Sequence, residues 1–327
     1  MIKVAIVVYD GCSPISPIGS LEILNKADVF YHPGLVSKFA PPFFEVKLVS
    51  LNGKYVTASG GYPLFCHNQI DEIEKVDLIL IAPFQGEVEE ILSKCRNLTP
   101  WLKKHYEAGA DIVSICTGGF LLAETGLLNG KSATTHWAFA DKFAERFPLV
   151  KLKSHKIIVD EGRICTCGGG FSFSNSVIYL VEKYCGSEVA IYLSKLLVTE
   201  VSKQPQNSYA IFSSQKTHAD EVILKAQRFM EEKYNEDLPV EEIASEFAVS
   251  VRNFIRRFKK ATGNTPGQYI QRVRIEAAKK SLENNEDSVQ NIVFDIGYDD
   301  ISTFRKLFKR YTGLSPVDYR KKFMRLG

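Results

Sequence analysis

Short apolar runs rich in β-branched residues alternate with longer amphipathic stretches over roughly the first 200 residues. The apolar runs read KVAIVVY, FEVKLVSL, DLILIA, DIVSIC and KIIVDEGRICTC. Segments with helical spacing lie between them, for example EVEEILSKCRNLTPWLKKHYEAG. Continuous apolar strands separated by helices are typical of a parallel sheet that helices cover on both faces. The pattern therefore predicts a doubly wound α/β domain over residues 1–200.

The pattern changes after this region. Residues 201–219 are rich in Ser, Gln and Lys and show no clear period, so we predict a linker there. From residue 220 to residue 327 the chain reads as amphipathic helices separated by short turns, which predicts an all-α domain. A total of 327 residues agrees with two domains, since one domain usually takes about 100–200 residues.

The all-α part repeats itself. The phrase ATGNTPGQY (261–269) returns fifty residues later as YTGLSPVDY (311–319). Each copy follows an amphipathic helix, a tight turn (AVS or GYDD) and a second helix whose apolar residues lie four apart. We therefore predict two helix-turn-helix units joined by the helix GQYIQRVRIEAAKKSLEN.

The ends of the second helix in each unit carry helix start and stop signals. Ser250 in the first copy and Asp299 or Asp300 in the second are predicted N-caps, because their side-chain oxygens can accept from the first free amides. Gly263 and Gly313 are predicted to end these helices.

The net charge of +3 conceals where the charge lies. From residue 220 onward there are 20 Lys and Arg against 17 Asp and Glu, whereas the preceding residues balance at 21 against 21. The second helices, VRNFIRRFKK and ISTFRKLFKR, carry five and four basic residues and no acid. Two basic helices on a near-neutral chain indicate an anionic partner that binds locally.

Two interpretations of the basic helices compete. A helical protein-interaction module would have such charges only as solvated faces. Two matched basic helices held by one linking helix can instead enter successive segments of the DNA major groove, and the repeat favours this hypothesis.

The C-terminal residues resemble the AraC/XylS class of transcriptional regulators. The phrase TFRKLFKRYTGLSPVDYR carries the resemblance, which extends over residues 220–325. It implies that side chains on the two second helices meet bases or phosphates: Arg252, Asn253, Arg256, Ser302, Thr303 and Lys306. Arg257 departs from the pattern, because the family usually has an aliphatic residue there, and we expect this side chain to snorkel.

A second informative stretch is DIVSICTGGFLLAETGLLNGKSATTHW (111–137). An apolar strand leads into Cys116, and Thr-Gly-Gly then opens a helix, which predicts a sharp elbow that exposes the cysteine. The helix dipole and neighbouring amides are expected to lower the pKa of the thiol. A buried structural cysteine is the alternative.

This stretch resembles the ThiJ/PfpI superfamily, whose fold is flavodoxin-like and related to the glutamine amidotransferases, and the resemblance extends over residues 2–195. It implies a pocket formed by Ser16, Gly86, Cys116, Thr117 and His136, with His136 in the place of the catalytic histidine. Ser16 replaces the usual acid, and the loop APFQG replaces the usual Pro-Gly-Gly loop. We therefore expect no catalytic residues and no enzyme activity.

The remaining chemistry of the chain is sparse. Cys165 and Cys167 form a Cys-x-Cys pair with His155 upstream, but a metal needs three or four ligands, so we expect no metal and no cofactor. Seven scattered cysteines indicate reduced thiols. No apolar run reaches the roughly 20 residues that span a bilayer, so we expect a cytoplasmic protein without a membrane partner.

The two resemblances together are those of the GlxA-like regulators. They imply a transcription factor, with activation as the expected output, whose N-terminal domain senses a small-molecule effector, forms a homodimer, or does both. The implied partners are double-stranded DNA and RNA polymerase. Two alternatives are a cysteine-dependent hydrolase or amidase fused to a DNA-binding domain, and a thiol-based redox sensor at Cys116.

Overall fold

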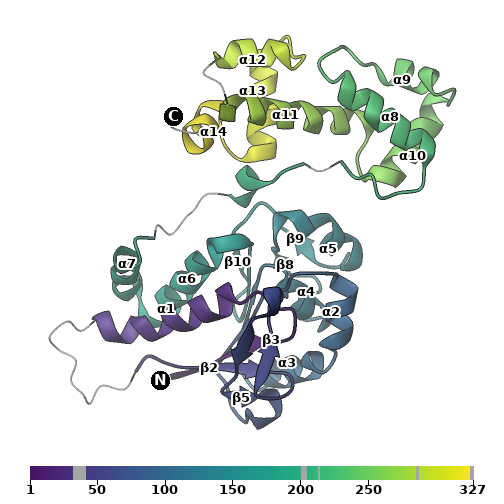
Figure 1. Cartoon of the computed structure of the whole chain (residues 1–327). Coiled ribbons are helices and arrows are strands. Elements are labelled where there is room, and N and C mark those ends of the chain that lie inside the picture. Colours follow the sequence, from purple (N-terminus) through teal and green to yellow (C-terminus); the bar gives the residue numbers. More distant parts are fainter. Residues whose placement is uncertain (32–41, 200–204, 213, 285–286, 325–327) are drawn as a thin grey trace. The chain divides into compact units, whose positions relative to one another are not determined.

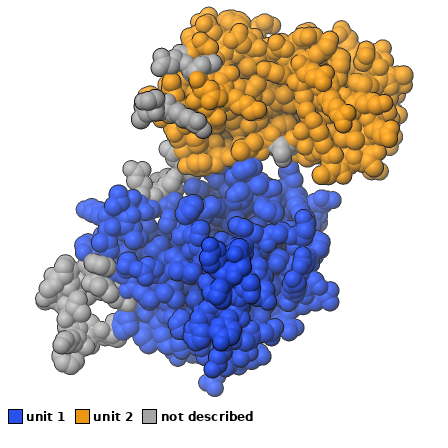
Figure 2. All heavy atoms as spheres, in the orientation of Figure 1, with its two compact units in different colours: residues 1–206 blue, residues 207–327 orange. Residues whose placement is uncertain are grey.

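The structure is a computed structural model that describes residues 1–31, 42–199, 205–212, 214–284 and 287–324 (Figure 1). The chain divides into two compact units, residues 1–206 and residues 207–327, and each is described by itself (Figure 2). Part of the predicted linker, residues 201–204 and 213, lies outside the described residues.

A seven-stranded sheet forms the centre of the first unit, in the order β10-β11-β7-β6-β1-β2-β5. Each apolar run of the sequence forms a strand or, at the end of the unit, the β10–β11 hairpin. The strands are β1 (Ile2–Val8), β2 (Phe44–Ser50), β5 (Asn68–Gln69), β6 (Leu78–Ile81), β7 (Asp111–Ile115), β10 (Ile158–Asp160) and β11 (Ile164–Cys167). All neighbours pair in parallel except β10 and β11. This is the doubly wound, flavodoxin-like sheet that the sequence predicted.

Helices cover both sides of this sheet (Figure 1). One group contains α1 (Ile15–Tyr31), α6 (Phe173–Cys185) and α7 (Ser187–Leu196), and the other contains α2 (Val88–Lys94), α3 (Leu98–Glu107), α4 (Gly118–Glu124) and α5 (Ala140–Arg146). Two small ribbons complete the unit: β3 (Tyr55–Thr57) with β4 (Pro63–Phe65), and β8 (Ser132–Ala133) with β9 (Lys151–Leu152). Because both faces are covered, the central strand β6 is completely buried.

The order of the strands also determines where a site can form. From β1 the chain continues to β2 on one side, while β6 pairs with β1 on the other. In open α/β sheets, ligands bind outside the carboxyl ends of the strands at the point where the strand order reverses. In this sheet that point lies beyond the ends of β1 and β6.

The second unit is entirely helical. Its helices are α8 (Glu221–Glu232), α9 (Val240–Glu246), α10 (Val251–Thr262), α11 (Pro266–Asn284), α12 (Val289–Asp295), α13 (Ile301–Thr312) and α14 (Pro316–Phe323). The sequence repeat appears as two similar cores. Phe254, Phe258 and Tyr269 are buried in one, and Phe304, Phe308 and Tyr319 take the same positions in the other. Helix α11 contributes to both, so it joins the two helix-turn-helix units.

The predicted helix ends are correct in part. Gly263 and Gly313 have left-handed φ values of 70° and 76° and end α10 and α13. Asp300 caps α13, because its carboxylate accepts from the amides of Ser302 and Thr303. The prediction for the first unit is wrong in its chemistry: Ser250 occupies the N-cap position of α10, but its side chain makes no capping hydrogen bond.

All seven cysteines lie within the described residues, and each is a free thiol. Cys165 and Cys167 are both buried on β11, with their Sγ atoms 3.9 Å apart. No group of three or more potential metal ligands occurs among the described residues. The helices within the described ranges include none that is long and apolar enough to cross a bilayer.

Candidate ligand pocket and DNA-binding helices

A pocket of about 390 Å³ lies where β1, β6 and β7 end, at the point of strand reversal. All five predicted pocket residues line it: Ser16, Gly86, Cys116, Thr117 and His136. The rest of the lining comes from Ser13, Ile15, Pro83, Phe84, Gln85, Phe139, Gly170, Phe171 and Phe173. The phrase GGGFSF directly after β11 predicts a glycine turn that leads into a helix lining the pocket, and it contributes Phe171 and Phe173 to the aromatic part of this wall.

Cys116 lies at a sharp turn between β7 and α4. Its φ of 56° is left-handed, as an elbow requires. The backbone N–H of Cys116 donates to the carbonyl of Cys167 at 2.9 Å, and the Thr135 hydroxyl donates to the Cys116 carbonyl at 3.0 Å. A side chain at Gly118 would lie 2.7 Å from the carbonyl oxygen of Ile81, so glycine lets α4 begin directly against β6.

The prediction of an acidic thiol is wrong. Burial raises the pKa of Cys116 and outweighs the hydrogen bonds from backbone amides, which act in the opposite direction. Helix α4 is only seven residues long, so its dipole offers little compensation. Near neutral pH the group is therefore a thiol and not the thiolate that acts as a nucleophile.

His136 is held in an orientation that does not suit a general base. Its Nδ1 accepts from the backbone N–H of Ala138 at 3.1 Å, and burial lowers its pKa. The ring is thus neutral, with its proton on Nε2. A Cβ atom at Gly169 would lie 1.5 Å from Cδ2 of His136, so the ring packs on the bare backbone there. No hydrogen bond joins Cys116 to His136 in the described chain.

Two amides of the loop after β6 are not free to act as oxyanion donors. The amide of Phe84 donates to Oγ1 of Thr117 at 2.8 Å, and the amide of Gln85 donates to the carbonyl of Gly11 at 3.2 Å. The hydroxyl of Thr117 in turn lies 2.9 Å from the Phe84 carbonyl. Both amides that replace the glycine amides of the related enzymes are therefore already engaged.

Ser16 occupies the position of the missing acid, in the first turn of α1. Its side chain is 4% exposed, and its Oγ has no hydrogen-bond partner among the described residues. A buried hydroxyl without a partner is uncommon, because losing water without a replacement is unfavourable. Ser16 therefore leaves a free polar group at the wall of the pocket.

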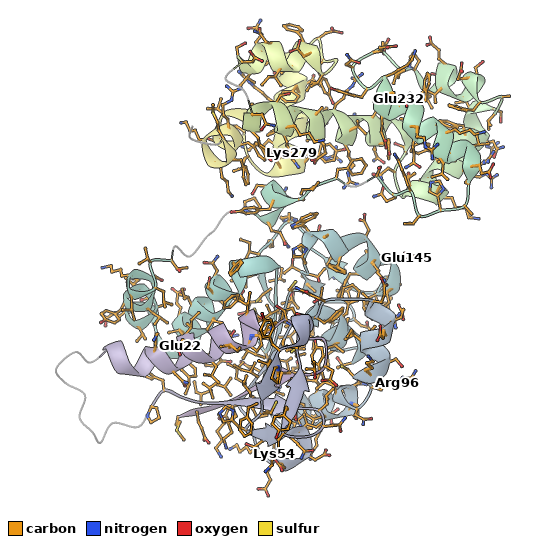
Figure 3. All side chains as sticks on the ribbon, in the orientation of Figure 1. Glu22, Lys54, Arg96, Glu145, Glu232 and Lys279 are labelled. Carbon is orange, nitrogen blue, oxygen red and sulfur yellow. The ribbon has the colours of Figure 1, made fainter. Side chains whose placement is uncertain are left out.

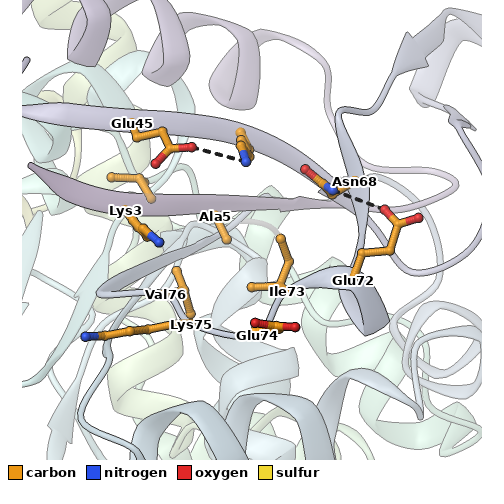
Figure 4. Close-up of a pocket in the computed structure, with 11 residues that line it drawn as sticks. Lys3, Ala5, Glu45, Asn68, Glu72, Ile73, Glu74, Lys75 and Val76 are labelled. Atoms are coloured by element: carbon orange, nitrogen blue, oxygen red, sulfur yellow. Dashed lines mark hydrogen bonds and ion pairs between the residues drawn. The ribbon is translucent and has the colours of Figure 1, made fainter.

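A second hollow of about 240 Å³ lies near the start of β1 (Figure 4). Its lining is mostly charged, but several of these groups satisfy one another. Glu45 pairs with Lys47 at 3.1 Å, and Asn68 donates to Glu72 at 3.1 Å. It contains none of the predicted site residues.

On α10, the side chains of Arg252 and Arg256 are exposed and that of Asn253 is half-buried. Arg256 donates from Nη2 to Oδ1 of Asn253 at 2.8 Å, so two of the predicted contact residues already hold each other in position. On the opposite face, Phe254 and Phe258 are buried.

Helix α13 repeats this arrangement. Ser302, Thr303 and Lys306 are exposed, and Phe304 and Phe308 are buried on the other face. The structure thus places all six predicted DNA-contact residues away from the two cores.

Arg257 has a specific partner that the sequence did not reveal. Its guanidinium makes two hydrogen bonds to Asp220, at 2.9 Å and 2.6 Å, and Asp220 is the N-cap of α8. The Arg257 hydrogen bond lowers the pKa of Asp220. Arg257 therefore connects α10 to α8, and it is not a free surface cation.

The fold and the two sites define a class of protein in which an amidotransferase-like α/β domain is joined to a DNA-binding helical domain. Comparison with known proteins agrees. Residues 3–178 match the DJ-1/PfpI family, and residues 243–322 match a helix-turn-helix domain. The chain belongs to the DJ-1/PfpI family and carries an AraC-type helix-turn-helix domain at its C-terminal end.

The matches to two curated transcriptional regulators extend over most of this chain. The HTH-type transcriptional regulator GbdR of Pseudomonas aeruginosa is 24% identical over 278 residues, which cover 84% of this chain and 74% of GbdR. The HTH-type transcriptional regulator GlxA of Rhizobium meliloti is 23% identical over 282 residues, 86% of each chain. A crystal structure of a Vibrio parahaemolyticus protein described as a transcriptional regulator is 27% identical, covers 60% of this chain and 98% of its own, and has a TM-score of 0.53.

Proposed function

We propose that this chain is a DNA-binding transcriptional regulator that activates its target genes, and that its DJ-1/PfpI domain senses a small molecule. One observation carries the DNA-binding part: two copies of a helix-turn-helix unit each expose a basic second helix and bury the opposite face. Exposed Arg and Lys side chains on a helix that fits the major groove are suited to phosphates and base edges. The relatives named as transcriptional regulators support the same function.

Footprinting of the full chain on DNA sites selected from a random pool tests this proposal. We expect protection of two major-groove segments on one face of the DNA, about one helical turn (~10 base pairs) apart. Replacing Ser302, Thr303 and Lys306 together by Ala should remove protection from one segment only. Simultaneous loss of both segments in a folded protein would contradict the idea that each unit reads DNA separately. Absence of any sequence-dependent protection at low salt would contradict DNA recognition itself.

Three features of the pocket support sensing over hydrolysis. The Cys116 thiol is protonated near neutral pH, His136 is a hydrogen-bond donor through Nε2, and the loop amides are engaged. A cysteine hydrolase needs a thiolate, an oriented base and free oxyanion donors. Purified protein should therefore hydrolyse neither amides nor esters above background, and Cys116-dependent turnover near the ~10 s⁻¹ of an ordinary enzyme would overturn this part.

The raised pKa of Cys116 also disfavours a redox sensor, because oxidation follows thiolate character.

A homodimer, a contact with RNA polymerase and a cytoplasmic location remain predictions of the sequence.

A further inference from the structure

We propose that the pocket at Cys116 binds an uncharged, largely apolar small molecule with one hydrogen-bond acceptor, which faces Ser16 and His136. This inference rests on the proposed sensing function and specifies the class of its ligand. The volume of about 390 Å³ falls within the ~300–1,000 Å³ of small-molecule sites.

The charge of the lining is the first argument. Among the residues that the structure describes, no Asp, Glu, Lys or Arg lines the pocket. Its two titratable members are neutral near neutral pH, because burial raises the pKa of Cys116 and lowers that of His136. A charged ligand would lose its water in this pocket and find no opposite charge to replace it.

Two polar groups of the lining can donate a hydrogen bond to a ligand. Ser16 has a buried hydroxyl without a partner, so its proton is available to a ligand. His136 carries its remaining proton on Nε2, because Nδ1 accepts from Ala138. Two donors in an apolar wall match a carbonyl, ether or hydroxyl oxygen. Helices α1 and α6 also begin at this wall, and their partial positive charge favours the negative end of a dipole and disfavours a cation.

The apolar part of the wall comes from several aromatic side chains. Phe173 is buried and packs on Gly19 of α1, where a Cβ atom would lie only 2.6 Å from the phenylalanine ring. Phe171 and Ile15 line the pocket but are 75% and 51% exposed, so apolar surface remains open to a ligand. Covering such surface favours an apolar ligand body.

Thiol reagents of equal reach and different charge test the selectivity of the pocket directly, without knowledge of the natural ligand. In each reaction the Cys116 thiolate attacks the methanethiosulfonate sulfur, a disulfide forms and methanesulfinate leaves, while the thiol proton goes to buffer. The neutral reagent carries a propyl group, the anionic one a sulfonatoethyl group and the cationic one a trimethylammonioethyl group. A Cys185→Ser background removes the other cysteine that is not fully buried.

Rates at Cys116, located by mass spectrometry, are divided by the rates of the same reagents with N-acetylcysteine amide. We expect the normalised rate of the neutral reagent to be at least ten times that of the anionic reagent, and to exceed that of the cationic reagent by a larger factor. Equal normalised rates for a charged reagent, or no modification of Cys116 in the folded protein, would overturn the proposal.

Ser16→Asp provides a matched variant. If Ser16 faces the ligand, a carboxylate there should raise the normalised rate of the cationic reagent at least tenfold, whereas Ser16→Ala should preserve the ranking of charges. An unchanged cation rate in a folded Ser16→Asp protein would remove Ser16 from the site. If Ser16→Asp fails to fold, the order of the three normalised rates in the parent protein still tests the proposed ligand class.

A separate measurement tests the proposed function: the affinity of the protein for DNA before and after modification with the propyl reagent. Charge selectivity without any change in DNA affinity would support the ligand class and contradict the sensing role. A change in DNA affinity without charge selectivity would support the sensing role and contradict the ligand class.

Discussion

At the scale of single residues, neighbours decide what Cys116 and His136 can do. The same two residue types form a nucleophile and base in enzymes, but here no hydrogen bond joins them in the described chain, and loss of water around each half-buried side chain keeps it neutral. The amides of Phe84 and Gln85 donate to acceptors within the protein, so these two amides cannot stabilise developing negative charge on a ligand. A retained pocket with altered chemistry is consistent with binding rather than turnover.

The raised pKa of Cys116 predicts how the thiol reacts with iodoacetamide. In a Cys185→Ser protein, the rate at Cys116 should keep rising with pH beyond the usual thiol pKa of about 8.5, because only the thiolate reacts. Since the folded pKa exceeds the unfolded one, any contribution of this group to stability is complete below the unfolded pKa and is lost as pH rises through the folded pKa. A pH profile that levels off near neutrality, measured by mass spectrometry, would show instead an activated thiol.

Arg256 and Lys259 on α10 offer a matched pair of substitutions that tests the predicted DNA contacts. Arg256 is exposed and held by Asn253, so we expect a base contact whose loss in Arg256→Ala costs about 1–3 kcal/mol and relaxes specificity at one base pair. Lys259 is also exposed but makes no such pair, and Lys259→Ala should weaken binding to all sequences about equally. Binding titrations of each variant against the selected site and its single-base variants measure the loss of affinity and the change in specificity. Equal behaviour of the two variants across those sites would mean that Arg256 contacts only phosphate.

At the scale of elements, the sequence was sufficient wherever the signal is local. Apolar runs and helical spacing identified six of the seven strands of the main sheet and the helical domain, because a strand or helix leaves its period in consecutive residues. The two-residue β5 and the small ribbons β3–β4 and β8–β9 are too short to leave such a period and were not predicted. The repeat was visible because both copies preserve the buried phenylalanines and the glycine that ends the second helix. Contacts between distant segments leave no such period. The pairing of Arg257 with Asp220 and the engagement of the loop amides therefore emerged only from the structure.

The turns of the two helix-turn-helix units show how one position can be filled in two ways. Ala248 in the first turn and Gly297 in the second both have left-handed φ, at 52° and 84°. A left-handed backbone is unfavourable for Ala but not for Gly. Gly297 has a further reason to be glycine, because a Cβ atom there would lie 2.5 Å from the carbonyl oxygen of Asn235.

Exchanging these residue types should therefore have opposite effects. Ala248→Gly is expected to stabilise the first unit by up to about 1 kcal/mol, and Gly297→Ala to destabilise the second by about 1–3 kcal/mol. Hydrogen exchange of the full chain reports the opening free energy of each unit separately. We expect slower exchange in α9 and α10 for Ala248→Gly and faster exchange in α12 and α13 for Gly297→Ala. Loss of stability in Ala248→Gly would contradict the assigned strain.

At the scale of the whole molecule, Gln206 is the last residue of the first unit and is held near the pocket. Gln206 is buried, and its carboxamide donates to the carbonyls of Thr135 and Lys156 at 2.8 Å and 3.0 Å. Thr135 itself holds the carbonyl of Cys116 and directly precedes His136. The segment that joins the two units thus begins on Thr135, which contacts the backbone of Cys116 and precedes His136 but does not itself line the pocket.

The segment that follows Gln206 contacts both cores of the second unit. The side-chain amide of Asn207 donates to the carbonyl of Tyr311 at 3.2 Å, in the core of the second helix-turn-helix unit. The ring of Phe212 packs edge-on against Tyr269 in the core of the first, with 5.4 Å between the ring centroids. Between them, the nearly buried Lys279 of α11 donates to the carbonyl of Ala210 at 2.6 Å (Figure 3). We propose that a change at the pocket reaches both helix-turn-helix units through this segment of the chain.

Gln206→Ala should weaken this connection. We expect its affinity for the selected DNA site to equal that of the parent protein before treatment, because Gln206 contacts neither DNA-reading helix. Modification of Cys116 with the neutral propyl reagent should then change that affinity at least threefold less than in the parent protein. Lys156→Ala is the control, because it removes an exposed side chain but keeps the carbonyl that accepts from Gln206. If Gln206→Ala responds to modification as fully as Lys156→Ala does, the signal does not pass through this residue. If the parent protein does not respond at all, the DJ-1/PfpI domain is not a sensor of this pocket's occupancy.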